Sequence, residues 1–259
     1  GKAIKYSQET KTFTDLGTIM PAPAQHCYIS YHQNALYCVT NAGTEKLKKL
    51  DLNTGVVTEI EAPAEIGSNS APYRGSRVLN DRYLAVNYNV GNPYTGAAKY
   101  HIALYDLQEQ KWADVIENTG ENWRFPPASE DNQFYYCREG YLYEYDLNTL
   151  QETKQLNRMS VMRGSEIFVE HPDFGRSLIS WSFSGEYNIY STLEKKGKTI
   201  RVADNIVAAL GSPMQHSIAV SEDGKVYAGE QQGQKSFEYN MLTGEKKLYH
   251  MAEPPAIFA

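Results

Sequence analysis

The sequence predicts an all-β protein built from a repeated four-stranded unit, and three observations lead to this fold class. Short runs of alternating apolar residues are separated by turns rich in glycine, asparagine and aspartate. Tyrosine, with 20 residues, and glycine, with 19, are abundant, and both favour strands and tight turns over helices. Hairpin patterns also recur along the whole chain, so we expect one structural unit to be used several times.

One half of the repeat is a hairpin whose turn begins with a short polar residue. Its clearest copy is YEYDLNTLQETKQL, residues 143–156, which has the pattern of a strand, a four-residue turn and a second strand. The aligned turn residues of all copies are Ser7, Asp51, Asp106, Asp146, Ser191 and Asn240. They lie 40 to 55 residues apart, so the sequence predicts six copies.

The other half is a hairpin with an Asx or glycine turn and an aromatic-rich second strand. Its copies cover residues 26–40, 74–88, 124–137, 166–181 and 216–229. The last copy turns at Asp-Gly because a tight hairpin needs positive φ, which these residues tolerate. Four antiparallel strands in about 40–50 residues are typical of a β-propeller blade. We therefore predict that residues 1–259 form a single domain, a six-bladed β-propeller.

Both termini are predicted to close the sixth blade. Five blades find all four strands between residues 26 and 251, and the sixth would take two outer strands from residues 2–19. PPAIFA, residues 254–259, would supply its inner strand. One strand is then missing, and a protein partner or a missing segment of the chain would complete the blade. A five-bladed ring with an extra hairpin is the alternative, whereas two β-sandwiches would not explain the repeated two-hairpin unit.

The copies contain no Trp-Asp repeat and no Gly-Gly doublet of the kelch type. The chain instead resembles the YncE-like and TolB-like bacterial propellers over essentially its whole length, which implies the propeller fold and a bacterial protein. Its cysteines, Cys27, Cys38 and Cys137, form neither a full disulfide set nor a C-x-x-C pair. They decide the compartment only weakly, and we favour an extracytoplasmic location, periplasmic or secreted.

The repeat also predicts a site, because the first residues of the inner strands of a propeller surround one mouth of its central channel. The repeat-equivalent positions, ten residues before the next strand, hold His26, Arg74, Arg124 and His216, with Glu166 in the fifth copy. The residues expected beside them are Gln25, Tyr73, Trp123, Gln215 and Arg163. The longest loop, residues 87–99, is expected on the same face.

Anion capture is the chemistry that this mouth predicts. Two guanidiniums and two imidazoles make a positive spot on a protein of net charge −6. The planar fork of arginine suits a carboxylate, sulfate or phosphate, and Tyr or Trp rings can stack on sugar faces. We therefore predict an acidic saccharide or another small anion as the ligand. The alternative is a mouth whose arginines pair internally with glutamate around water.

A lyase that cleaves uronates is the enzymatic form of this hypothesis, and the sequence leaves open whether the protein is an enzyme. Arg74 and Arg124 would neutralise the carboxylate, and His26 or His216 would remove the neighbouring proton. PMQHSIAVSEDG, residues 213–224, resembles the oligogalacturonate lyases, which are propeller enzymes with a histidine-rich metal site. Here only His26, His216 and Gln215 can converge, so a divalent metal lacks a full ligand set.

Charge and hydropathy argue against two other classes of partner, nucleic acids and membranes. The negative net charge argues against a nucleic-acid partner, and no apolar stretch approaches the roughly 18 residues of a membrane span. A non-catalytic module that binds a protein partner remains the alternative function. A contiguous exposed aromatic patch on the outer strands would favour that alternative, and an open pocket at the mouth would favour ligand binding.

Overall fold

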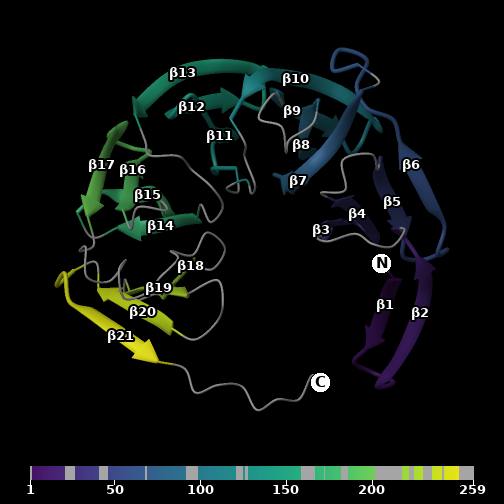
Figure 1. The fold of residues 1–259 in the computed structure, drawn as a ribbon, viewed down its shortest axis with the longest axis horizontal. Helices are drawn as coiled ribbons and strands as arrows, with labels where there is room; N and C mark the ends of the chain where they lie inside the picture. The colour runs from purple at the N-terminus through teal and green to yellow at the C-terminus, as the bar shows by residue number, and fades with distance from the viewer. Residues whose placement is uncertain are drawn as a thin grey trace. The chain divides into compact units, whose positions relative to one another are not determined.

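The computed structural model is all-β in the part of the chain that it describes (Figure 1). The described residues are 2–20, 27–40, 46–67, 69–91, 99–120, 125, 128–158, 167–171, 173–181, 186–201, 218–221, 225–229, 235–240 and 242–250. Their strands form six separate antiparallel sheets, each made of strands that are consecutive in the chain. The all-β fold class is thus confirmed. The chain divides into two compact units, residues 1–134 with 146–151, and residues 135–145 with 152–259.

The first unit contains a hairpin and two four-stranded sheets. The hairpin pairs β1 (Lys2–Ser7) with β2 (Thr12–Thr18). The next sheet has the order β3 (Cys27–His32), β4 (Ala35–Thr40), β5 (Leu47–Asp51) and β6 (Val57–Ile60). The third has the order β7 (Ser70–Leu79), β8 (Tyr83–Val90), β9 (Lys99–Asp106) and β10 (Lys111–Thr119).

The remaining sheets repeat this plan. The first of them holds β11 (Gln133–Arg138), β12 (Tyr141–Asp146) and β13 (Gln151–Arg158), and the unit boundary passes through it. Next come β14 (Ile167–His171), β15 (Gly175–Trp181), β16 (Glu186–Ser191) and β17 (Lys196–Arg201). The last holds β18 (Ile218–Val220), β19 (Lys225–Gly229), β20 (Lys235–Asn240) and β21 (Lys246–His250).

Sheet β11–β13 has one strand fewer, in its described residues, than the sequence predicts. The expected inner strand begins at residue 124, but Phe125 and Ala128, the described residues of that segment, are not in a strand. The sequence between them is Pro126-Pro127. Proline has no N–H to donate to a ladder and is therefore rare inside sheets. The strand was expected from the hydrophobic pattern of the repeat alone, without regard to these two prolines.

The predicted turn residue has the same structural role in all six sheets of the described chain. Asp51 Oδ1 accepts hydrogen bonds from the amides of Asn53 and Thr54 at 2.8 and 2.9 Å. The side-chain oxygens of the other five accept amide hydrogen bonds in the same way: Ser7, Asp106, Asp146, Ser191 and Asn240. Such bonds let a short polar side chain stabilise a tight turn. The repeat is confirmed at these positions.

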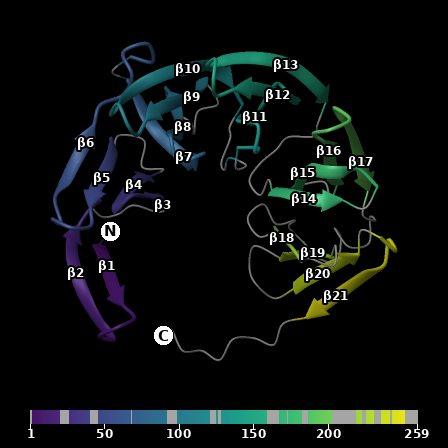
Figure 2. The ribbon, with the colours of Figure 1, turned by 180° about the vertical axis from the view of Figure 1, so that it is seen from behind.

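Two hydrophobic clusters hold the sheets of the first unit together, face to face. One lies between sheets β3–β6 and β7–β10 and includes Tyr37 and Val86. The other lies between the β1–β2 hairpin and the opposite face of β3–β6, and it includes Cys38 and Ile19. Tyr37 and Cys38 are neighbours in β4 and so point to opposite faces. The three sheets therefore stack in chain order (Figure 2).

The second unit has a similar contact between sheets. Tyr135 and Leu142 of sheet β11–β13 pack against Leu178 and Tyr190 of sheet β14–β17. Lys195, in the turn before β17, forms an ion pair with Glu144 of β12 across the same pair of sheets. The described part of the chain contains no helix that is long and apolar enough to cross a membrane.

Candidate functional site

The structure describes two of the ten predicted site residues, Tyr73 and Arg74, and both lie on β7. The other eight lie outside the described residues: His26, Arg124, Glu166, His216, Gln25, Gln215, Trp123 and Arg163. β3 begins at the residue after His26, and β18 begins two residues after His216. Convergence of the ten side chains at one mouth stays a prediction.

β7 carries a bulge of three residues centred on Arg74. Residues 73–75 lie opposite the single residue Asn87 of β8, between regularly paired positions on either side. Arg74 and Gly75 adopt positive φ values of 49° and 66°. This backbone region is uncommon for residues other than glycine. Bulges that re-aim a side chain occur frequently beside functional sites, so the bulge makes Arg74 a candidate functional residue.

The bulge corrects the predicted equivalence of Arg74 and His26. Judged by its pairing with the second strand, Pro72 is the β7 residue that corresponds to Cys27 of β3. The equivalent of His26 is therefore Ala71. The shift arises because the turn after β7 is one residue longer and the bulge adds two residues. Arg74 reaches its position through the bulge and is not the first residue of its strand.

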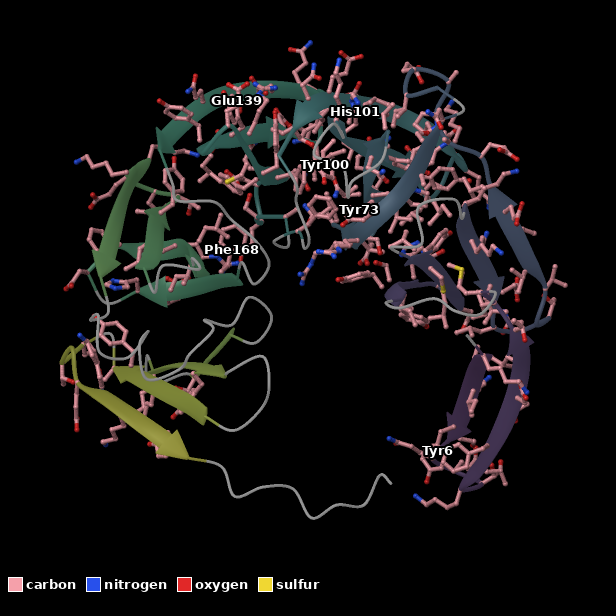
Figure 3. The ribbon with its side chains drawn as sticks, viewed as in Figure 1. Tyr6, Tyr73, Tyr100, His101, Glu139 and Phe168 are labelled. Atoms are coloured by element: carbon pink, nitrogen blue, oxygen red, sulfur yellow. The ribbon has the colours of Figure 1, made fainter. Side chains whose placement is uncertain are left out.

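Tyr73 is a buried support for Arg74. Its side chain is 3% exposed, and its ring lies 5.9 Å from that of Tyr100, centroid to centroid (Figure 3). The Arg74 guanidinium lies 5.0 Å from the Tyr73 ring centroid, within the range of a cation–π contact. Asn87 Nδ2 donates a hydrogen bond of 2.9 Å to the Tyr73 carbonyl and so braces the bulge. Tyr100 is only partly buried and is the aromatic ring that a ligand could contact.

Buried polar atoms gather on the face of the sheet that carries Tyr100. Asn89 and Thr119 are the cross-strand neighbours of Tyr100 on β8 and β10. Asn87 lies two residues from Asn89 and so points to the same face. Among the described residues, Asn87 Oδ1, Asn89 Oδ1 and Thr119 Oγ1 are buried and find no hydrogen-bond partner. A buried polar atom without a partner costs about 1–3 kcal/mol.

The two asparagine amides are oriented by their own nitrogen atoms. Asn87 Nδ2 donates to the Tyr73 carbonyl, and Asn89 Nδ2 donates to the Gly91 carbonyl at 2.8 Å. Both Oδ1 atoms are left as acceptors, and Thr119 adds a hydroxyl that can donate or accept. Arg74, on the bulge opposite Asn87, is the cation of this part of the sheet.

A metal site is not formed by the described residues, in which no group of three or more His, Cys, Asp or Glu side chains could hold an ion. The histidine-rich set implied by the lyase resemblance, His26 and His216 with Gln215, lies outside them. Its fit to a metal therefore stays a prediction, and we assign no step to one.

The asparagines and Thr119 were not among the predicted site residues. Residues 87–99 were expected to form a loop, but β8 continues to Val90. The segment LAVNYNV, residues 84–90, carries the signal that identifies them, since strict alternation puts both asparagines on one face of a strand. Thr119 ends β10 after a register shift, and no sequence pattern predicts its pairing with Tyr100.

Comparisons with known proteins concern the fold. A structure of hydrazine synthase from Kuenenia stuttgartiensis matches 91% of this chain and 69% of its own, with a TM-score of 0.58 and 12% sequence identity. At this identity the likeness shows a shared fold and carries no information about activity. No protein-family model matches the sequence, and no curated protein matches it.

Proposed function

We propose that the chain is a six-bladed β-propeller whose sixth blade is closed by both termini. The support is the repeated sheet of consecutive antiparallel strands, the turn residue shared by six sheets, and the face-to-face stacking within each unit. β2 precedes β3 as β6 precedes β7, so the β1–β2 hairpin takes the place of the outer strands of a blade. The five-bladed alternative would leave this hairpin outside the ring.

We further propose that the protein binds an acidic saccharide at the Arg74 site. The observation that carries this proposal is the group of three buried oxygens on the sheet that holds the Arg74 bulge, which find no hydrogen-bond partner among the described residues. A uronate supplies the missing groups. Its hydroxyls donate to the oxygens of Asn87 and Asn89, and its carboxylate binds the guanidinium. The ring of Tyr100 offers an apolar face to the sugar.

Binding is tested by calorimetric titration with digalacturonate and with the neutral disaccharide of galactose. We expect digalacturonate to bind, and Arg74→Gln to weaken its binding about tenfold or more, because a charge-assisted hydrogen bond is lost. The neutral disaccharide should lose little with this substitution. Arg82→Gln is the matched control, since Arg82 also lies 5.0 Å from a tyrosine ring, that of Tyr83, at the opposite end of β8.

The same titration separates a binder from a lyase. A lyase would release a product with an unsaturated sugar ring, which absorbs ultraviolet light, and substitution of His26 or His216 would abolish this release. A binder leaves digalacturonate intact. No binding of acidic saccharides, or binding that Arg74→Gln leaves unchanged, would disprove the proposal.

A second candidate function is binding of a protein partner along β1. Among the described residues β1 pairs only with β2, whereas β5, the strand of equivalent position, pairs on both sides. A groove of about 450 Å³ beside β1 is lined mainly by apolar residues, including Ile4 and Ile29. On the hairpin, Phe13 is 73% exposed, and its ring contacts that of Tyr6 in a tilted arrangement, 4.9 Å between centroids. An edge that pairs with no other described strand, beside an apolar groove, suits an added strand.

Amide hydrogen exchange along β1 tests this second candidate. Fast exchange in the isolated protein indicates an edge that is open to a partner strand. Slow exchange indicates that the chain covers its own edge, and the partner proposal would then be wrong.

A further inference from the structure

The β1–β2 hairpin covers only part of the face of sheet β3–β6 against which it packs. Cys38 of β4 is buried in the cluster beneath the hairpin, but Ile29, its cross-strand partner on β3, is 56% exposed. Tyr31 lies two residues further along β3, on the same face, and is 61% exposed. Val78 of β7 corresponds to Tyr31 in its pairing with the second strand, and it packs against the cluster between two four-stranded sheets. In the described chain a two-stranded hairpin therefore leaves open what a four-stranded sheet covers.

The groove of about 450 Å³ beside β1 lies over this uncovered surface. Ile4 and Lys5 of β1 line it together with Ile29 and Leu36 of the facing sheet. One wall of the groove is thus the edge of a strand, and the floor is the apolar face of a sheet. Paired strands lie about 4.8 Å apart and stacked sheets about 10 Å apart, so a strand that pairs with β1 would lie over this floor.

Sheet β3–β6 shows how a strand is placed at the equivalent edge. The turn residue Ser7 follows Lys5 by two residues, as Asp51 follows Lys49, so the two lysines correspond. β4 pairs antiparallel with β5 and places Tyr37 opposite Lys49. A strand added to β1 in the same register would place one of its residues opposite Lys5.

The residue opposite Lys5 would point to the floor of the groove. Tyr37 points from β4 into the cluster with the next sheet, and Lys49 Nζ lies 6.0 Å from the centroid of its ring. Leu36 and Cys38, the neighbours of Tyr37 in β4, point to the other face. An aromatic ring opposite Lys5 would therefore fill the groove and place its face within reach of the ammonium group.

We propose that β1 binds one antiparallel strand of a partner protein that carries a tyrosine or phenylalanine opposite Lys5. This inference rests on the second candidate function and adds the direction, the register and the side-chain chemistry of the partner strand. The aromatic residue packs on Ile29 and Leu36. Its two neighbours in the strand point away from the groove, toward the side on which Ile4 and Tyr6 are exposed.

Peptides copied from β4 test the register, with binding followed by NMR shifts of the β1 amides. The parent peptide is NALYSVT, residues 34–40 with serine in place of Cys38. We expect it to bind β1. Serine in place of its tyrosine should weaken binding about tenfold or more, because the ring supplies the apolar area buried in the groove. Serine in place of its leucine should weaken binding no more than about fivefold, as for a cross-strand pair on an open face.

Two protein variants test whether the peptide lies in the groove. Ile29→Asn places a polar group on the floor and should weaken binding of NALYSVT several-fold. Val56→Asn is the matched control, because Val56 is also a β-branched residue, is 55% exposed and lies outside the groove. It should leave binding unchanged. Both side chains are exposed, so neither substitution removes a buried contact of the fold.

The outcomes separate this inference from the function on which it rests. Fast amide exchange along β1 together with no binding of NALYSVT, or with equal losses for the two serine peptides, would overturn the inference alone. Equal binding to Ile29→Asn and Val56→Asn would also overturn it, since the peptide would then lie elsewhere. Slow exchange along β1 would contradict both the inference and the second candidate function.

Discussion

At the scale of single residues, the backbone of β7 decides what Arg74 can do. A regular strand would place residue 74 on a face dictated by alternation, but the bulge at residues 73–75 releases it from that pattern. Tyr73 then packs under the guanidinium, and Asn87 braces the carbonyl of Tyr73. Arg74 is thus held on one side by an aromatic ring, and its hydrogen-bonding fork is positioned by neighbours that are themselves buried.

His101 gives a prediction for the pH dependence of stability. It follows Tyr100 on β9, points to the other face and is buried, and burial lowers its pKa below the ordinary value of 6.5. Protons therefore bind this histidine more tightly in the unfolded chain. The contribution of neutral His101 to the free energy of unfolding is fully present above about pH 6.5 and is lost as the pH falls below that value. His101→Gln should lose less stability than the wild type between about pH 7 and pH 5 in urea unfolding. Equal losses would contradict this.

At the scale of the elements, the turn residues are equivalent in role but not in environment. Asp106 is buried, and its carboxylate accepts two amide hydrogen bonds and faces Arg82, whereas Asp51 is more exposed. Burial acts to raise the pKa of Asp106, but the amides of Glu109 and Gln108 and the Arg82 guanidinium outweigh it and lower the pKa.

Alanine substitution of the two turn aspartates tests this difference. Asp106→Ala should cost about 2–3 kcal/mol, since it removes a buried carboxylate that accepts two amide hydrogen bonds and pairs with Arg82, and Asp51→Ala about 1 kcal/mol. Urea unfolding of both variants measures the two free energies. A cost for Asp51→Ala equal to or above that for Asp106→Ala would show that burial does not set the contribution of the turn.

The same elements show what a sequence can predict. Strand alternation and Asx turns are local, so hairpins such as β5–β6 and β9–β10 follow directly from their residues. A bulge depends on pairing with another strand, and counting residues therefore misplaced Arg74 by three positions. The asparagines of β8 were assigned to a loop because the polar letters of NYNV resemble one. Periodicity gives the register of a regular strand, but a bulge shifts that register and shows only in the pairing with the next strand.

At the scale of the whole molecule, the repeat predicted the sheets, and the proposed Arg74 site draws its described residues from one of them. The bulge of β7, the acceptors of β8 and the hydroxyl at the end of β10 all belong to sheet β7–β10. One face of this sheet carries Asn87, Asn89 and Thr119, and the other packs against sheet β3–β6 through Val86 and Tyr88.

The most direct test of the central claim is a crystal structure of the protein with digalacturonate. The account predicts a uronate carboxylate paired with the Arg74 guanidinium, sugar hydroxyls donating to the side-chain oxygens of Asn87 and Asn89, and the ring of Tyr100 against the sugar. Digalacturonate bound elsewhere, or an Arg74 site in which water alone satisfies these oxygens at saturating ligand, would contradict it.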